Sequence, residues 1–304
     1  MNYNIMLGDA IELLSTLEDE SIDCIITDPP YEVISGGSNE NPNVNRPGGI
    51  LSKNDGKIFE HNNIGITEWI GECYRVLRQD THIYIMTNFL NLEDYLRAIR
   101  DVGFDIHNLL VWEKNTATPN RWYMKNAEYI IFARKGNAKP INYCGSKTVM
   151  QFNSVSKRIH PTEKPLDLLK VLITNSSNPG DIILDPFGGS MSTARAAILT
   201  GRIPISFELD PNYYELGLKS IQDINPEDIE IVEVAPPRLT ESQMLIYNFL
   251  KENPNQDYTA LEVSEALDLP VKTCAGCITP LFNAGLVEKT NNKSPFKIKF
   301  KKDL

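Results

Sequence analysis

Residues 21–31 read Ser21-Ile22-Asp23-Cys24-Ile25-Ile26-Thr27-Asp28-Pro29-Pro30-Tyr31, an apolar run that ends at an acid, two prolines and an aromatic ring. The run from Ile22 to Thr27 is too short for a helix and rich in β-branched residues, so it predicts a buried strand. This strand would deliver Asp28 to its carboxyl end, the edge where open α/β sheets bind ligands. Proline fixes φ and donates no backbone hydrogen bond, so the chain should leave the sheet in a stiff bend with free carbonyls.

The bend would bring together a carboxylate, a carbonyl and a stacking ring. Asp28 and the Pro29 carbonyl can each accept one hydrogen from the exocyclic amine of a nucleobase, while Tyr31 stacks on the ring. Both hydrogen bonds would make the amine nitrogen more nucleophilic. Because Asp and Pro are also ordinary turn residues, a strand followed by a tight turn explains this motif about as well, and a second motif must decide.

The composition is that of a soluble globular protein. The chain has 304 residues, of which 41% are hydrophobic and 23% charged, enough for one large α/β domain and a small appendix. It has no apolar run of membrane-spanning length and no signal-peptide pattern at Met1, so we expect a cytoplasmic protein without membrane contact. The five cysteines are scattered and Cys274 and Cys277 have no second ligand pair nearby, which argues against disulfides and against a metal site.

The charge balance bears on a nucleic-acid partner. A formal net charge of −10 argues weakly against one, because phosphate neutralisation supplies most nonspecific affinity. The basic residues are concentrated between Arg134 and Lys164, where Glu163 is the only acid, and again near the C-terminus from Lys289 onward. A locally positive face is therefore compatible with the acidic total.

Around the first motif the chain alternates strands and helices. The loop Glu32–Asn63 is rich in Gly, Ser, Asn and Pro; a loop this long is usually functional, and we expect it to order on substrate. The connection Glu113–Lys125 carries Arg121 among aromatic residues, which suits either nucleic-acid contact or a solvated hairpin tip. The expected strands are Asn4–Leu7, Ile22–Thr27, Ile83–Thr87, Ile106–Trp112, Tyr129–Ala133, Asp181–Asp185 and Ile203–Phe207. The expected helices are Ala10–Leu17, Ile66–Leu77, Leu92–Asp101, Leu166–Thr174, Thr193–Leu199 and Asn212–Ile221.

A second motif, Asp185-Pro186-Phe187-Gly188-Gly189-Ser190, joins the strand ending at Asp185 to an Ala-rich helix. A Gly-rich turn lets a ligand approach the backbone closely, and an acid at the end of the following strand, here Glu208, can bind ribose hydroxyls. These features indicate an adenosine-type ligand. The turn alone also fits a nicotinamide cofactor, or a packing glycine with no ligand.

Taken together, Asp28-Pro29-Pro30-Tyr31 and the second motif resemble the signatures of DNA amino-methyltransferases that use S-adenosylmethionine. The order, catalytic motif first, is similar to that of the permuted β class, and His160-Pro161-Thr162-Glu163-Lys164-Pro165 matches a third landmark of that class. The resemblance covers Asn2 to about Ser220. One departure is Met191 after Ser190, where the family more often has glycine.

The resemblance implies a fold and a set of site residues. The fold is a doubly wound, Rossmann-like α/β sheet of seven strands, permuted, in which Ile106–Trp112 and Tyr129–Ala133 form a reversed edge hairpin. The implied catalytic residues are Asp28, Pro29, Pro30 and Tyr31. The implied cofactor residues are Asp9, Thr162, Lys164, Asp185, Phe187, Gly188, Gly189, Ser190 and Glu208, with Glu208 on the ribose, Asp9 near the adenine, and Thr162 and Lys164 near the methionine end.

The implied substrate is double-stranded DNA, with the target base flipped out of the helix. No metal and no strong base is required, because the leaving group is a neutral thioether and the proton can be lost after transfer. Members with Asp before the prolines mostly methylate adenine N6, so Asp28 favours adenine over cytosine N4. Two more functions compete with this one: methylation of an RNA or a protein amide nitrogen, and DNA-binding regulation by a protein whose methyltransferase body is inactive.

The domain boundaries follow from the same motifs. Residues 1–235 form the catalytic domain, made of a catalytic half (1–134), a target-recognition segment (135–159) and a cofactor half (160–225). Residues 236–304 follow Pro236-Pro237 and predict three short helices and a β-wing, a small winged helix-turn-helix-like domain. The expected DNA contacts are Arg121, Lys147, Lys157 and Arg158. The resemblance to restriction-modification enzymes leaves a homodimer and a cognate restriction nuclease open as further partners.

Overall fold

The computed structural model describes residues 2–30, 64–118, 123–137, 140–155, 163–231, 239–283, 286–290 and 295–300. The chain divides into two compact units. One comprises Met1–Ala138 and Gly145–Glu233, and the other Lys139–Cys144 and Val234–Leu304. The boundary expected at Pro236-Pro237 falls outside the described residues.

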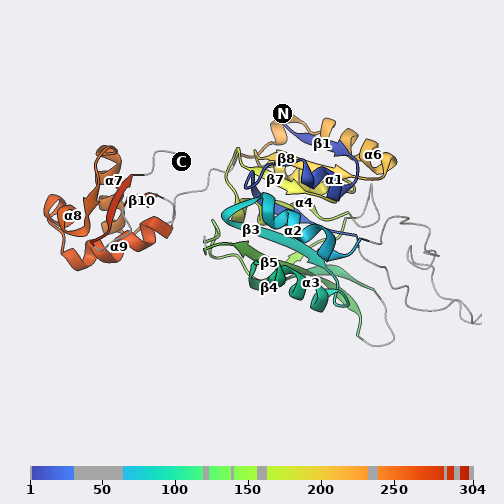
Figure 1. Ribbon diagram of the computed structural model, residues 1–304, viewed down its shortest axis with the longest axis horizontal. Helices are drawn as coiled ribbons and strands as arrows, with labels where there is room; N and C mark the ends of the chain where they lie inside the picture. The colour runs from blue at the N-terminus through green and yellow to red at the C-terminus, as the bar shows by residue number, and fades with distance from the viewer. Residues whose placement is uncertain are drawn as a thin grey trace, which may run out of the picture. The chain divides into compact units, whose positions relative to one another are not determined.

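The larger unit is built on a mixed sheet whose described part has eight strands in the order β1-β8-β7-β2-β3-β5-β4-β6 (Figure 1). The pairings run parallel from β1 to β3, β5 is antiparallel to β3 and to β4, and β6 is parallel to β4. The strands are β1 (Asn4–Leu7), β2 (Ile22–Thr27), β3 (Leu77–Thr87), β4 (Asp105–Thr118), β5 (Lys125–Lys135), β6 (Val149–Phe152), β7 (Ile182–Asp185) and β8 (Ile203–Glu208). β5 is thus the only reversed strand among those described.

The sheet differs from the expected seven strands by the addition of β6. Val149–Phe152 pairs along β4 from Val111 to Lys114, so the β4–β5 hairpin is not the outermost element as expected. The Trp112 indole also donates to the Phe152 carbonyl at 2.9 Å. The four residues show little alternation of apolar and polar side chains, and Val149 and Gln151 are exposed. The sequence therefore gave only a weak indication of this strand.

Among the described residues of the larger unit, three α-helices precede β4, and three α-helices and a short 3-10 helix, η2 (Pro226–Asp228), follow β6. The helices are α1 (Ala10–Ser15), α2 (Ile66–Val76), α3 (Leu92–Asp101), α4 (Leu166–Ser176), α5 (Ser192–Leu199) and α6 (Pro211–Gln222). α2 lies against both α1 and α3 (Figure 1). α5 lies against both α4 and α6. The fully buried Trp69 and Ile70 of α2 pack in one cluster with Ile25 of β2 and Ile83 of β3, which shields the central strands from water.

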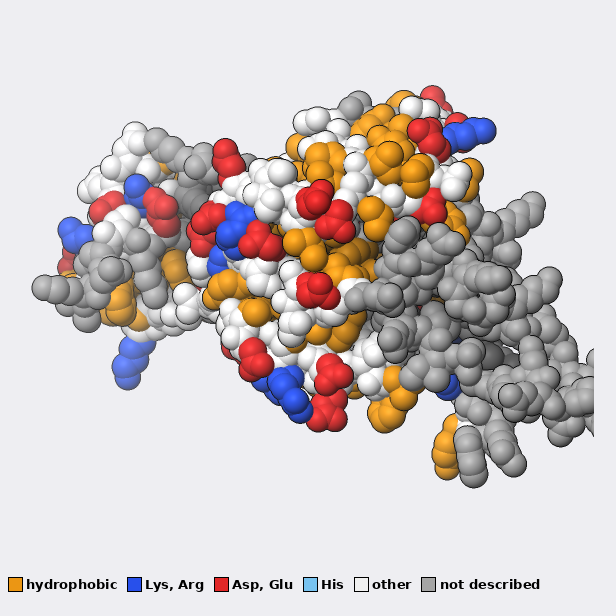
Figure 2. Space-filling model, turned by 45° about the vertical axis from the view of Figure 1, so that its right-hand side comes forward, with side chains coloured by type: hydrophobic (Ala, Val, Ile, Leu, Met, Phe, Trp, Pro, Cys, Tyr) orange, Lys and Arg blue, Asp and Glu red, His pale blue; other side chains and the backbone are white. Residues whose placement is uncertain are grey.

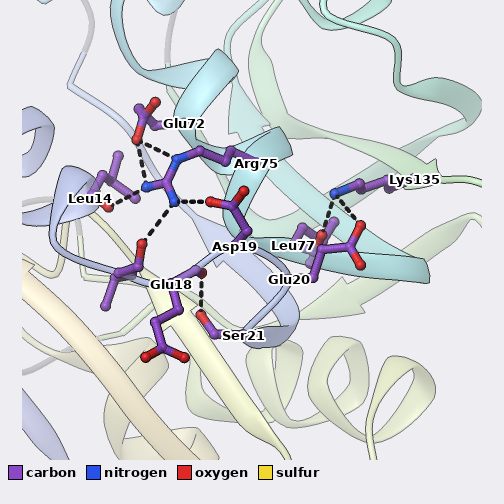
Figure 3. Close-up of polar contacts among 10 residues, drawn as sticks. Leu14, Glu18, Asp19, Glu20, Ser21, Glu72, Arg75, Leu77 and Lys135 are labelled. Carbon is purple, nitrogen blue, oxygen red and sulfur yellow. Dashed lines mark hydrogen bonds and ion pairs between the residues drawn. The ribbon is translucent and has the colours of Figure 1, made fainter.

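Arg75 fastens α1 to α2 at the amino end of the central strands (Figure 3). α1 has no basic residue in its last turn, and the Arg75 guanidinium donates to the Leu14 and Leu17 carbonyls at 2.9 and 2.8 Å. The same group pairs with Asp19 at 2.6 Å and with Glu72 at 2.7 Å. One planar cation thereby binds two carbonyls at and just beyond the end of α1, of which the Leu14 carbonyl also accepts from the Leu17 N–H at 3.1 Å.

The smaller unit has its own core and contains the three expected helices and an antiparallel strand pair, to which a third strand, β9, adds that was not expected. Its helices are α7 (Glu241–Glu252), α8 (Ala260–Leu267) and α9 (Val271–Asn283), and its antiparallel sheet has the order β10 (Val287–Lys289), β11 (Lys297–Phe300) and β9 (Tyr258–Thr259). Thr240 with Gln243, and Thr259 with Glu262, form capping boxes that start α7 and α8. Cys274 and Cys277 are buried among apolar side chains of this core.

Two negative findings concern only the described part of the chain. No helix there is both long enough and apolar enough to cross a membrane. No group of three or more His, Cys, Asp or Glu side chains there is arranged to hold a metal ion.

Candidate active site

The two motifs meet where the chain direction across the sheet reverses. β2 and β7 are adjacent and parallel, with Cys24 beside Ile183 and Ile25 beside Leu184. From β2 the chain proceeds to β3 on one side, whereas from β7 it proceeds to β8 on the other side. Such a reversal leaves a crevice at the carboxyl ends of the two strands, where open α/β sheets bind ligands. The Thr27 hydroxyl donates to Asp185 Oδ1 at 2.9 Å and links the two motifs directly.

Asp28 lies at the carboxyl end of β2, as the sequence predicted. Its Oδ2 accepts a hydrogen bond from the Lys164 ammonium, which belongs to the third landmark and precedes α4. Its Oδ1 is buried, and no described residue donates a hydrogen bond to it. Because a buried carboxylate oxygen without a donor is costly, Asp28 is prepared to accept a hydrogen from a ligand.

Lys164 is held by a second acid that sequence reasoning missed. Glu128 of β5 lies 3.4 Å from Lys164 Nζ through Oε2, and its Oε1 pairs with the ammonium of Lys114 on β4. The Lys164 side chain is 7% exposed, so it is enclosed between the two carboxylates. The result is an alternating row of charges, Asp28, Lys164, Glu128 and Lys114, across β2, β5 and β4.

This row sets the protonation of the two acids. Burial raises the pKa of Asp28, the charge of Glu128 raises it further, and Lys164 opposes both without cancelling them. Burial also acts to raise the pKa of Glu128, but Lys164 and Lys114 together hold that pKa below its usual range. Glu128 is therefore firmly ionised, whereas the charge of Asp28 depends on Lys164.

Asp185 forms the base of the second motif and is 4% exposed. Burial raises its pKa to about 6, although hydrogen bonds from Thr193, Thr27 and the Phe187 backbone oppose the shift. The Phe187 N–H donates to Asp185 Oδ1 at 3.1 Å, which shapes the start of the turn. The Phe187 ring then packs edge-on against Trp69 of α2, with 5.3 Å between centroids.

Glu208 and Gly189 face each other across the glycine turn. Glu208 ends β8, and its Oε2 accepts from the Gly189 N–H at 2.6 Å, while its Oε1 accepts from the Asp210 N–H at 2.8 Å. Gly189 has φ +52°, and a Cβ built on it would meet no atom within 4 Å. The turn is thus open above Gly189, and the carboxylate of Glu208 is fixed beside that opening.

Gly188, Ser190 and Met191 form the underside of the same turn. A Cβ on Gly188 would lie 2.4 Å from Ser206 Oγ and 2.7 Å from Met191 Sδ, so this glycine is required by packing. The buried Ser190 hydroxyl lies 2.9 Å from the Ser192 hydroxyl. Met191, the position where the family more often has glycine, has the left-handed φ of 59° and is fully buried. The structure therefore keeps the glycine-like backbone with a methionine in place.

Asp9 follows β1 at the same edge of the sheet. Leu7 pairs with Glu208, and the Gly8 N–H donates to the Glu208 carbonyl at 2.9 Å, so Asp9 comes directly after a residue bonded to the end of β8. Its Oδ1 accepts from the Ile11 and Glu12 N–H groups at 2.9 and 3.2 Å and caps α1. A structural role for Asp9 is thus visible, and its contact with adenine remains a prediction.

Several expected site residues lie outside the described residues: Tyr31, Thr162, Arg121, Lys157 and Arg158, together with the whole Glu32–Asn63 loop. Lys147 is described and exposed. On the face drawn in Figure 2, acidic and basic side chains of the described residues are interspersed without a continuous basic surface. The DNA-contacting residues therefore remain predictions from the sequence.

Glu128 and Lys114 were missed for an identifiable reason. The sequence predicted strands ending at Trp112 and starting at Tyr129, which left both residues in the connection between them. In the structure β4 extends to Thr118 and β5 starts at Lys125, so both belong to the hairpin ladder. Polar residues in a strand weaken the periodic signal, and the pairing of Glu128 with Lys164 and with Lys114 is visible only in the folded chain.

Comparison with known proteins identifies the family. The N6/N4 DNA methylase profile, described as DNA methylase, matches residues 22–219. This chain belongs to that DNA methylase family. The Type II methyltransferase M2.MboI of Moraxella bovis is 31% identical over 248 residues, which cover 74% of this chain and 89% of the relative. The Type II methyltransferase M.HinfI of Haemophilus influenzae is 29% identical, covering 81% of this chain and 77% of the relative.

Solved structures agree with the fold of the DNA methylase. A crystal structure of the M1.HpyAVI–SAM complex is 25% identical with a TM-score of 0.55, and the match covers 72% of this chain and 99% of that one. The PvuII DNA methyltransferase, which is cytosine-N4-specific, has a TM-score of 0.57 at 17% identity, covering 74% of this chain and 88% of that one. At that identity the second match shows the fold alone. The family model, which covers both amines, leaves the choice between them open.

Proposed function

We propose that this methylase transfers a methyl group from S-adenosylmethionine to the N6 amine of adenine in double-stranded DNA. The observation that carries the proposal is the meeting of two distant motifs. Asp28 and Asp185, 157 positions apart in the chain, lie at the carboxyl ends of adjacent strands where the sheet reverses, and the hydroxyl of Thr27, the neighbour of Asp28, donates to Asp185. Membership of the DNA methylase family supports the reaction, and a relative solved with SAM supports the cofactor.

The glycine turn fits the cofactor on structural grounds. The open space above Gly189 admits a ligand close to the backbone, and Glu208 is fixed beside it to accept hydrogen bonds from ribose hydroxyls. Asp185, Phe187, Gly188, Ser190 and Asp9 would complete the surroundings, with Thr162 and Lys164 toward the methionine end. When bound, the cofactor supplies the methyl group carried on its sulfonium sulfur.

The base side is the task of the first motif. Asp28 Oδ1, which has no donor among the described residues, accepts one hydrogen of the target amine, and the Pro29 carbonyl accepts the other. Tyr31 stacks on the flipped base. These contacts hold the nitrogen lone pair toward the methyl group, so catalysis is mostly positioning. The methylated nitrogen then loses one proton, for which the Asp28 carboxylate is an acceptor.

Adenine is favoured over cytosine by the residue before the prolines. Both bases present the same amine to the same two acceptors, so the geometry at Asp28 does not choose between them. The assignment rests on the association of Asp in this position with adenine methylation in the permuted β class. N4-methylation of cytosine is the competing assignment, and the N6/N4 family includes both.

DNA recognition is assigned to segments outside the catalytic centre. Lys147, Lys157, Arg158 and Arg121, together with the Glu32–Asn63 loop, are proposed to contact DNA. We infer that the smaller unit is a winged helix-turn-helix-like module, based on its three helices and the antiparallel β10–β11 pair. The Type II relatives make a restriction-modification role the proposed context, with a cognate nuclease as a candidate partner.

A transfer assay tests the proposed reaction. The enzyme and tritiated S-adenosylmethionine are incubated in three separate reactions, one with unmethylated genomic DNA, one with total RNA and one with a protein lysate. We expect label in DNA alone, and an Asp28→Ala variant as the matched control should give background counts. Label in RNA or protein, with none in DNA, would refute the DNA assignment.

A further inference from the structure

The row of charges beside Asp28 contains two members, Glu128 and Lys114, that the reaction as described does not use. The Lys164 ammonium donates to Asp28 Oδ2 and lies 3.4 Å from Glu128 Oε2, so one cation is shared by two acids. Lys114 pairs with the other oxygen of Glu128 and also lies 5.0 Å from the centre of the Trp112 ring. The charges therefore alternate in sign along the row.

The position of Lys164 poses a problem for base binding. Asp28 must accept a hydrogen bond from a neutral amine of the base. In the structure, however, the Lys164 ammonium already donates a hydrogen bond to Asp28 Oδ2. If Asp28 were the only acid beside Lys164, the ion pair between the two would be stronger. The ammonium would then draw electron density away from the Asp28 carboxylate. After transfer the amine nitrogen carries a positive charge, which Lys164 beside the same carboxylate would repel.

We propose that Glu128 is a positioning residue: it shares the Lys164 ammonium with Asp28 and thereby keeps the Asp28 carboxylate available to the base amine. The inference rests on the proposed function, since the base amine is the group that Asp28 is to receive. Lys114 sets the balance of this sharing. Its charge neutralises part of Glu128 and limits how strongly Glu128 attracts Lys164 away from Asp28.

The charged and titratable groups around Asp28 come from several elements. Lys164 lies before α4, Glu128 is on β5 and Lys114 on β4, while Tyr95 of α3 and Asp185 of β7 also interact electrostatically with Asp28. Glu128 acts to raise the pKa of Asp28, and Lys114 acts to lower it. Removing either charge should therefore move the titration of Asp28, and the two removals should act in opposite directions.

The test measures transfer of tritium to unmethylated genomic DNA at limiting DNA concentration, from pH 5 to pH 9, where kcat/KM reports the ionisation of the free enzyme. The acid limb, at which activity falls as Asp28 takes up a proton, should lie at lower pH in Glu128→Gln and at higher pH in Lys114→Gln. On the plateau, Glu128→Gln should be about tenfold slower, because one charge-assisted hydrogen bond to Asp28 is then strengthened.

The matched control is Glu113→Gln. It removes another carboxylate of the same hairpin, one that accepts a hydrogen bond from the Gln151 side chain at 2.8 Å. Its acid limb should coincide with that of the wild type. If Glu128→Gln fails to fold, Glu128→Asp, which withdraws the carboxylate by one methylene, should shift the limb in the same direction by a smaller amount.

Two results overturn the inference. If both charge removals leave the acid limb in place, or both move it in one direction, then Glu128 does not control the Asp28 carboxylate. A wild-type enzyme that transfers no label to DNA would refute the proposed function as well. The two failures are distinguishable, because only the first occurs with an active wild type.

Discussion

At the scale of single residues, the proposed function divides the work of the site between Asp28 and Glu208. Asp28 follows β2 and has one buried oxygen without a donor among the described residues, whereas Glu208 ends β8 with one oxygen bonded to the Gly189 N–H of the glycine turn and the other to the Asp210 N–H. The first acid is thus suited to the base and the second to the cofactor. Between them stands Asp185, buried and bonded to Thr27.

Replacing Asp28 by alanine should reduce methylation at least about hundredfold, since one positioned hydrogen bond at the reacting group is lost. Binding of S-adenosylmethionine should survive, because the contacts around Gly189 and Glu208 are untouched. Isothermal calorimetry measures the binding, and the tritium assay measures the rate. Loss of cofactor binding in Asp28→Ala would contradict this division of roles.

Asp185 should make the stability of the fold depend on pH. Its pKa is raised from 3.8 to about 6, so the folded state binds the extra proton between these values and loses stability as pH rises through them. Asp185→Asn lacks this loss. The unfolding free energy of the variant relative to the wild type should rise by about 2 kcal/mol from pH 4 to pH 6.5 and stay nearly level above.

Urea unfolding of both proteins at each pH checks the prediction for Asp185. The difference between them carries the information, because all other titrating groups are common to both. A difference that is constant across the range would show that Asp185 titrates at its ordinary pKa in the fold.

At the scale of elements, the turn between β7 and α5 depends on an unusual residue. Met191 has a left-handed backbone, while its side chain fills the space between Gly188 and Gly217. A Cβ on Gly217 would lie 2.4 Å from Met191 Cγ, so the two glycines are matched to this methionine. The departure from the family pattern is thereby compensated within the packing.

Met191→Ala and Met191→Gly should both destabilise the protein, by about 2–5 kcal/mol for the lost side chain. The glycine variant should be the more stable of the two by about 1 kcal/mol, because it relieves the left-handed strain. Glu215, which is exposed within α6, is the control position. There the alanine variant should be more stable than the glycine variant by a similar amount of unfolding free energy. The same order at both positions, measured by urea unfolding, would refute the strain argument.

Arg75 should matter for the docking of α1 on α2. Arg75→Ala removes four hydrogen-bonded partners, and we expect a loss of about 2–3 kcal/mol in unfolding free energy. Arg75→Lys should recover little of it, since one ammonium lacks the planar fork. Arg97→Ala, which breaks an exposed pair with Glu93 in α3, should cost less than about 0.5 kcal/mol. Equal losses in the two alanine variants would contradict the role given to Arg75.

The elements also show what could be predicted from sequence. The buried strand Ile22–Thr27 was placed at its observed bounds, because β-branched residues end abruptly at Asp28-Pro29. The hairpin strands β4 and β5 were predicted too short, since their outer parts carry polar residues that read as a loop. The role of Glu128 in the site was not predicted either. Its partner Lys164 is 36 positions away, and no local sequence pattern links the two residues.

At the scale of the whole molecule, one sheet gathers segments that are far apart in the chain. Asp28 of the first motif, Lys164 of the third landmark and Asp185 of the second motif lie at the same edge, because β2 is adjacent to β7 and Lys164 binds Asp28. The family resemblance predicted that the two motifs meet. Strand β6 and the row of charges from Asp28 to Lys114 became visible only in the structure. The smaller unit adds a second fold with its own core.

The central claim, that the molecule methylates an exocyclic amine of adenine in DNA, has one direct test. Unmethylated DNA is incubated with the purified enzyme and S-adenosylmethionine, hydrolysed to nucleosides and analysed by mass spectrometry. The account predicts N6-methyladenine as the main modified nucleoside, and none with Asp28→Ala. N4-methylcytosine as the main product would contradict the adenine assignment while leaving the enzyme class intact, and the absence of any methylated nucleoside would contradict the claim as a whole.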